Sequence, residues 1–387
     1  MKAKDSCIFL MVLFTWLSIS GQGTNMIYEK IDVSPDPYKF LHSDIDNIPG
    51  TEDYLISATQ KFPFYVVDKD LNIKSTYDVG NWYAGSRLNT SNDGNYILLQ
   101  QLFYLDFSPN KDREVKFEVI ETATGKEVLT IDAAHDADFH PNNQELIVLE
   151  GDNLYSYSLI GKGKKVLLPT PDATNCMAYS PDGSKVAISH HVAEDYLDAY
   201  VTKKRQKDNY KLYKKYRQCV SVYETESYSL LYTVDEMFDI PYALQFSPDG
   251  STLLCYSVPH TKVVAKTGMT GSKYISIINA ETGETLPRGF VSNAIYEPDF
   301  EFSNSLKHFA LVTMNQGRFP EIWVCRYEDA SIIARFELAK RLFGGHTKGQ
   351  YPADDGRVGI AFSPDDSHLL ITNGSLIFKW QIPYENE

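Results

Sequence analysis

A repeated turn constrains this chain more than any other feature. The stretches MAYSPDGSKVAIS from Met177, LQFSPDGSTLLCYS from Leu244 and IAFSPDDSHLLIT from Ile360 each join two apolar runs through a Ser-Pro-Asp turn. Pro fixes φ for such a turn, Asp caps it, and Gly supplies a positive φ. The flanking runs have the length and composition of β-strands. We therefore predict a β-hairpin at each copy.

Weaker copies of the same pattern fill the rest of the chain. The residue just before each turn falls at positions 47, 90, 139, 179, 246, 302 and 362. A second landmark follows each copy, namely an alternating strand, a tight polar turn and another strand, as in KFEVIETATGKEVLTI from Lys116. Each unit thus supplies four antiparallel strands, A to D. Seven such units predict an all-β fold, a seven-bladed β-propeller of four-stranded blades.

The last unit carries motifs of a known family. It contains Gly345 and His346, then the turn after Phe362, and then SLIFKWQI with Trp380. In these residues it resembles a WD40 repeat, although Gln381 replaces the usual Asp and the other units lack Gly-His. TolB-like and lactonase-like propellers also use Ser-Pro-Asp-Gly turns and are close alternatives. The resemblance implies the propeller fold and leaves the function open.

The last unit also lacks a fourth strand. Only PYENE follows Ile382, so the edge of strand C would be exposed. The segment Met26–Val33 alternates like a strand and belongs to no unit. We predict that it pairs beside Leu376–Ile382 as the outer strand of blade seven and so closes the ring.

The first twenty residues have the order of a secretory signal peptide. Two lysines precede the apolar run Cys7–Ile19, and small residues stand before a plausible cut at Gly21. Because a membrane span needs roughly 20 apolar residues, this run is too short to be one. We expect a signal peptide over residues 1–20 and an exported protein (periplasmic, cell-surface or secreted) whose residues 24–387 form a single propeller domain.

The charge of the chain is uneven. The formal charge is −14, and loss of residues 1–20 makes it slightly more negative, because two lysines and one aspartate are removed. An acidic chain of this kind argues against nucleic acid as a partner. A basic insertion at 192–217 stands apart, because Lys203–Arg217 holds eight Lys or Arg residues and one acid. We name this stretch the basic arm. Its candidate partner-binding residues are Lys203, Lys204, Arg205, Lys207, Tyr210, Lys211, Tyr213, Lys214, Lys215, Tyr216 and Arg217.

The basic arm admits more than one interpretation. It can hold an acidic protein or an anionic glycan, or it can fold back onto its own acidic propeller. Its tyrosines recur at three- and four-residue steps, which favours a short helical hairpin over a long β-hairpin.

All the long connections are predicted at one end of the ring. In a four-stranded meander the A–B and C–D turns share one end, the turn rim, and the B–C and D–A connections share the other, the loop rim. The long connections are Gln101–Arg113, Val192–Arg217, Val258–Ser272, Met314–Pro320 and Arg341–Gly356. Every one is a B–C or D–A connection, so we expect the loop rim to be the working surface.

Strand A of each blade begins at the loop rim and lines the central channel. The candidate channel-mouth residues are Trp82, Arg87, His135, Asp136, Asn175, Tyr242, Glu297, Asp299 and Arg357. They form either an ordinary wet channel wall or a pocket for a small molecule or a reaction, as in lactonase-like or amine-dehydrogenase-like propellers.

Catalytic motifs and metal ligands are weak in this sequence. Neighbouring residues on a strand point to opposite faces, so His190 and His191 do not readily share one metal ion. We expect no metal, no cofactor and no catalytic residue, and we interpret the four cysteines after the signal peptide as mostly buried free thiols. The preferred function is a non-enzymatic module that binds a protein on its loop rim.

Overall fold

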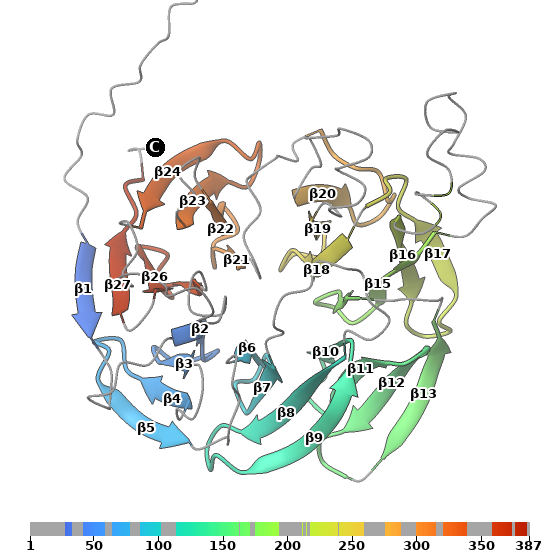
Figure 1. Ribbon diagram of the computed structural model, residues 1–387, viewed down its shortest axis with the longest axis horizontal. Helices are drawn as coiled ribbons and strands as arrows, with labels where there is room; N and C mark the ends of the chain where they lie inside the picture. Colours follow the sequence, from blue (N-terminus) through green and yellow to red (C-terminus); the bar gives the residue numbers. More distant parts are fainter. Residues whose placement is uncertain are drawn as a thin grey trace, which may run out of the picture.

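The computed structural model is a ring of seven antiparallel sheets around a central channel (Figure 1). The residues that it describes are 28–32, 42–58, 64–77, 86–101, 114–161, 163–170, 175–192, 211, 214, 217–238, 240–258, 275–287, 299–314, 320–338, 358–373 and 376–384. The signal peptide predicted for residues 1–20 lies outside these ranges.

Blade one consists of β2 (His42–Asn47), β3 (Tyr54–Ala58), β4 (Phe64–Val67) and β5 (Ile73–Tyr77), and blade two consists of β6 (Ser86–Thr90), β7 (Tyr96–Gln101), β8 (Val115–Glu121) and β9 (Glu127–Ala134). Blade three consists of β10 (Asp136–Phe139), β11 (Glu145–Glu150), β12 (Asn153–Ser158) and β13 (Lys164–Pro169). Blade four consists of β14 (Met177–Tyr179), β15 (Lys185–His191), β16 (Gln218–Glu224) and β17 (Leu230–Thr233).

Blade five consists of β18 (Ile240–Phe246), β19 (Thr252–Val258) and β20 (Ile275–Asn279). Blade six consists of β21 (Phe300–Phe302), β22 (His308–Met314), β23 (Pro320–Arg326) and β24 (Ile332–Glu337). Blade seven consists of β25 (Ile360–Phe362), β26 (His368–Asn373), β27 (Leu376–Gln381) and β1 (Tyr28–Asp32). In blade five, the described part of the outer edge pairs through one bridge, between Ile278 and Thr285.

The predicted hairpin positions are confirmed in every blade. The innermost strands end at Asn47, Thr90, Phe139, Tyr179, Phe246, Phe302 and Phe362, which are the seven positions that the repeat indicated. A regular turn therefore sets the register of each blade.

Side-chain hydrogen bonds explain why this turn recurs. In blade four, the Ser180 hydroxyl donates to Asp182 Oδ1 at 2.6 Å, and Ser184 N donates to the same oxygen at 3.0 Å. These donors hold the pKa of Asp182 at about 2. Gly183 takes the left-handed conformation that ends the turn, with φ +74°. The same pattern of a Ser hydroxyl donating to an Asp recurs at Ser91 and Asp93, Ser247 and Asp249, and Ser363 and Asp365.

The hydrophobic core is divided into seven clusters, one between each pair of neighbouring blades. Strand β7 shows how one strand serves two clusters. Leu98 packs toward blade three, whereas Ile97 and Leu99 pack toward blade one, because side chains alternate along a strand. The middle strands are buried on both faces, which explains their continuous apolar runs. Each blade is therefore stabilised by both of its neighbours.

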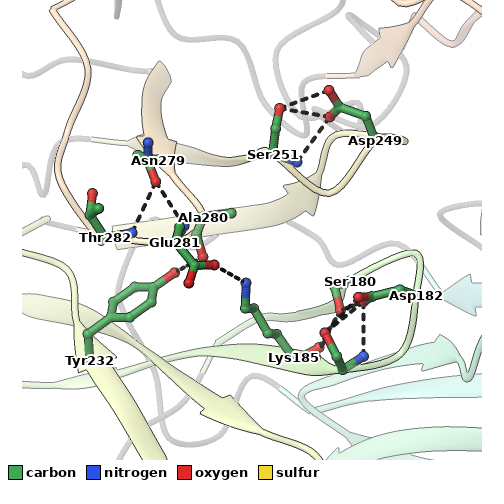
Figure 2. A network of polar contacts seen from close by, with 11 residues as sticks. Ser180, Asp182, Lys185, Tyr232, Asp249, Ser251, Asn279, Ala280, Glu281 and Thr282 are labelled. Carbon is green, nitrogen blue, oxygen red and sulfur yellow. Dashed lines mark hydrogen bonds and ion pairs between the residues drawn. The ribbon is translucent and has the colours of Figure 1, made fainter.

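Polar contacts at the turn rim also join neighbouring blades. Between blades four and five, the Tyr232 hydroxyl donates to the Ala280 carbonyl at 2.7 Å, and Lys185 forms an ion pair with Glu281 at 2.9 Å (Figure 2). The Tyr232 ring lies against Gly283, where an added Cβ would come within 2.5 Å of it. Such contacts need short turns of fixed shape.

The ring closes as predicted. Strand β1 pairs antiparallel with β27, with Tyr28 opposite Trp380 and Asp32 opposite Leu376, and the two lie side by side at the edge of the ring (Figure 1). Trp380, the residue that carries the WD40 resemblance, is fully buried between blades six and seven. The chain thus uses its first described strand to complete its last blade.

Three repeats have another residue at the glycine position of the turn. Asp366 in blade seven stands where blades two, four and five have Gly, and its φ is +58°, as are those of Asn143 and Leu306 at the same position in blades three and six. The Asp366 carboxylate accepts hydrogen bonds from the backbone nitrogens of Asn304 and Ser305, both at 2.8 Å. These bonds, which tie blade seven to blade six, offset the strain that Asp has at a positive φ.

The cysteines agree with the prediction of free thiols. Cys176, Cys219, Cys255 and Cys325 are all buried and free. Among the described residues there is no helix with the length and apolar character needed to cross a membrane.

Candidate functional site at the loop rim and channel

The described strand ends place the long connections at the loop rim. The sheets have the order A-B-C-D with antiparallel neighbours, so the ends of the B and D strands lie at one rim. Long connections follow β7, β15, β19 and β24, which are B or D strands in every case. The predicted insertion at Met314–Pro320 is not longer than an ordinary turn, because β22 ends at Met314 and β23 begins at Pro320, as closely spaced as Tyr179 and Lys185 at the opposite rim. Most residues of these connections lie outside the described ranges.

The base of the basic arm is well defined. His191 pairs with Gln218, and Val192 N donates to the Arg217 carbonyl at 3.3 Å, so the two ends of the insertion lie together. Lys211 and Lys214 are helical and exposed. The other candidate residues of the arm before Arg217 lie outside the described residues, namely Lys203, Lys204, Arg205, Lys207, Tyr210, Tyr213, Lys215 and Tyr216.

The central channel holds a cavity of about 640 Å³, which is lined by strand starts at the loop rim and also by Asn92, Pro141, Pro181 and Pro248 in the turns of the opposite rim. Six of the predicted channel-mouth residues line it together: Arg87, His135, Asp136, Asn175, Tyr242 and Asp299. Trp82, Glu297 and Arg357 lie outside the described residues. Six of the nine predicted residues thus share one cavity, and their function stays a prediction.

Three aspartates at the starts of inner strands join neighbouring blades. Asp44 accepts a hydrogen bond from Ile45 N at 2.9 Å through one oxygen and from Leu88 N of blade two at 2.8 Å through the other. We call this arrangement an aspartate clamp. The same arrangement joins Asp136 to the backbone nitrogens of Ala137 and Met177 at 3.0 and 2.8 Å, and Asp299 to those of Phe300 and Ile360 at 2.9 and 2.7 Å. The clamps therefore link blades one to two, three to four and six to seven.

A second layer of cavity residues was not predicted. Asp46, Asn89, Asp138 and Glu301 lie two positions beyond the strand-start residues of their blades. Gln245 lies three positions beyond Tyr242, because the register of β18 shifts between Pro241 and Ala243. The alternation of side chains along a strand places residues i and i+2 on one side. The acidic pattern at positions 44 and 46, 136 and 138, and 299 and 301 was visible in the sequence and could have identified this layer.

The cavity wall is strongly acidic. Burial raises the pKa of Asp46 and Asp136 to about 7 and that of Asp138 to about 6. Burial also raises the pKa of Asp299, and the Arg87 guanidinium opposes this shift. Hydrogen bonds from backbone nitrogens favour the ionised form of each group. The wall therefore contains carboxyl groups that change protonation near neutral pH.

Metal and nucleophile chemistry are not supported by the described side chains. No three His, Cys, Asp or Glu residues within the described ranges gather as a metal site. His190 is buried, and its Nε2 lies 2.7 Å from the Ser221 hydroxyl. Burial raises the pKa of Cys219 to about 12, so this cysteine is a neutral thiol. We interpret this polar cluster in blade four as structural.

Comparison with known proteins defines the fold. No protein-family profile matches the sequence, and no curated protein matches it. Among solved structures, the β-propeller domain of Cps50 (Swd1) from Myceliophteria thermophila is similar, with a TM-score of 0.58 and 12% sequence identity. The similarity covers 92% of this chain and 100% of that domain.

The chain is a seven-bladed propeller with a WD40-like fold. As many as 1307 solved chains match this structure, so the likeness identifies a widespread scaffold. A scaffold of this kind supports many functions, and the residues of the rims and the channel distinguish one such protein from another.

Proposed function

We propose that this protein is an exported binding module that holds a protein partner on its loop rim. The observation that carries the proposal is the unequal length of the connections at the two rims. Long connections follow four strands that end at the loop rim, namely β7, β15, β19 and β24, while the turns of the opposite rim are short. Binding residues of repeat scaffolds commonly lie on loops that a rigid frame positions.

The charge of the basic arm suggests the chemistry of the partner. The arm carries a net charge of +7 from eight basic residues and one acid, whereas the whole chain is at −14. A concentrated positive segment on a negative scaffold attracts an acidic surface and speeds the encounter. We therefore propose that the partner is a protein with an acidic patch. The N-terminal residues 1–20, which have the order of a signal peptide, support a location outside the cytoplasm.

The test removes the arm without disturbing the blade. Because Val192 and Arg217 are already hydrogen bonded, residues 193–216 can be replaced by Asn-Gly, which favours a two-residue hairpin. Capture from the exported fraction is then compared between the intact protein and this variant, at low and high salt. Loss of the partner without the arm, and weaker capture in salt, are expected. Equal capture by both proteins would contradict the proposal.

A ligand in the channel is a second candidate function, favoured by the 640 Å³ cavity and its polar wall. In that case a small molecule would raise the melting temperature of the intact protein, and an Arg87→Ala variant would lose this effect while retaining the captured partner. An anionic glycan is the third candidate. It predicts a glycan-array signal that depends on the arm and disappears in high salt.

A further inference from the structure

The junction of blades six, seven and one contains a group of carboxyl side chains. Asp44 and Asp46 come from β2 of blade one, and Asp299 and Glu301 come from blade six. Blade seven lies between them, and its chain passes so close that a Cβ at Gly359 would lie 2.8 Å from the Asp44 Cα. Four acids are thus gathered where the ring closes.

Hydrogen bonding distinguishes Glu301 from the other three acids. The carboxylates of Asp44 and Asp299 each accept two backbone N–H groups, and that of Asp46 accepts Asn47 N at 2.7 Å. No described residue donates a hydrogen bond to the Glu301 carboxyl group. A carboxylate in a half-buried position without donors is costly to ionise. Glu301 is therefore the member of the group that most favours the neutral form.

The charged surroundings of Glu301 act in the same direction. Burial raises the pKa of Glu301 well above its usual value, and the carboxylates of Asp299, Asp46 and Asp44 raise it further. Burial raises the pKa of Asp44 well above its usual value and also raises that of Asp299, and the nearby Arg87 guanidinium opposes both shifts. The blade-seven strand β25 between them consists of Ile-Ala-Phe and contributes no titratable side chain.

We propose that Glu301 is a proton-dependent lock on the junction of blades six, seven and one. A neutral Glu301 adds no charge beside the neighbouring aspartates, which hold their hydrogen bonds to the backbone. An ionised Glu301 adds a further negative charge between blades one and six and weakens the junction. The ring is then held more firmly in mildly acidic than in alkaline conditions.

The sign of the pH effect follows from proton binding. In the unfolded chain Glu titrates near ~4.3, so the folded protein binds more protons than the unfolded chain above that pH. Stability then falls as the pH rises from about 4.3 to the raised folded value, and it is constant above that value. The aspartates with raised pKa values contribute in the same direction up to about 7.

The experiment compares melting temperatures of the wild type and Glu301→Gln between pH 5 and pH 8.5. Gln has the shape of the neutral acid and cannot ionise, so the melting temperatures of the two proteins are expected to differ least at pH 5. At pH 8.5 the variant is expected to melt higher by ~2–5 °C. A difference that grows with pH supports the lock, and a difference that is constant, absent or negative at pH 8.5 overturns it.

Two controls separate the lock from general effects. Glu226→Gln removes one charge from an exposed turn of blade four, and no growing difference is expected. Asp299→Asn breaks a clamp, because its amide nitrogen would face a backbone N–H, and it should melt lower at every pH. A Glu301→Gln variant that does not fold at pH 5 would also overturn the proposal, since glutamine replaces only the neutral form.

An infrared measurement on the wild type tests the same point without relying on thermal stability. A protonated side-chain acid has a carbonyl stretch that a carboxylate lacks. We expect this band in the folded wild type near pH 7.5, where Asp46 and Asp136 are mostly ionised, and a weaker band in Glu301→Gln. A band of equal strength in both proteins, or none in the wild type, would overturn the proposal.

Discussion

The two rims of this propeller differ in the length of their connections and in the contacts that those connections make. At the turn rim, short turns bond to themselves and to the next blade, as in the contact of Tyr232 with Ala280 and of Asp366 with Asn304. At the loop rim, long connections follow four of the strands, and their sequences share no common pattern. In a repeat ring, therefore, the regular turns of one rim can fix the fold while the connections of the other rim vary in length and sequence.

Removing the closing strand should have the largest effect on stability. Without residues 26–33, β27 loses five paired residues and the ring has an exposed strand edge. We expect the melting temperature to fall by ~5–10 °C or more, measured by circular dichroism. Removal of residues 385–387 is the control, because no described strand includes them. An unchanged melting curve would contradict the closure.

A pair of glycines tests the packing of the turn rim. Gly283 and Gly50 have nearly equal φ values, +76° and +77°, but an added Cβ meets the Tyr232 ring at position 283 and nothing within 4 Å at position 50. Both alanine variants incur the left-handed backbone cost of about 1–2 kcal/mol. Gly283→Ala should lose roughly 1–3 kcal/mol more in chemical denaturation. Equal losses would show that the Tyr232 contact does not matter.

A smaller effect should follow from removing one inter-blade hydrogen bond. Tyr232→Phe keeps the ring and loses the bond to the Ala280 carbonyl, which we expect to cost about 1 kcal/mol. Tyr155→Phe is the control, because no described residue bonds to the Tyr155 hydroxyl. If both variants unfold at the same denaturant concentration as the wild type, the polar contacts of the turn rim do not stabilise the ring.

The smallest effect on stability should come from the loop rim. Replacing residues 193–216 by Asn-Gly leaves the pairing of His191 with Gln218 in place. The melting temperature should change by no more than ~2 °C. A fall as large as that expected for removal of the closing strand would show that the basic arm is part of the framework.

The fold could be predicted because its signals are local. Each hairpin is specified by a Ser-Pro-Asp turn and two apolar runs, so all seven inner strands end where the repeat placed them. The closing strand was predictable from an unpaired edge and an unassigned alternating segment. The hydrogen bonds that Asp366 accepts from Asn304 and Ser305 were not, because they join turns about 60 residues apart in the sequence.

The candidate site was predictable only in part. Strand starts such as Arg87 and Asp299 were expected at the channel, and they line one cavity. The aspartate clamps were not expected, since the distance from Asp44 to Leu88 N depends on how two blades pack. Nor does sequence alone say that Glu301 lacks a donor, which is a property of the assembled ring.

Binding of the partner at the loop rim can be tested by capture with matched variants of the two rims. One variant has residues 193–216 replaced by Asn-Gly, and the other carries lysine in place of the exposed turn-rim residues Glu226 and Glu284. With both variants folded, we expect the loop-rim variant to lose the partner and the turn-rim variant to retain it. Retention by the loop-rim variant together with loss by the turn-rim variant would contradict binding at the loop rim.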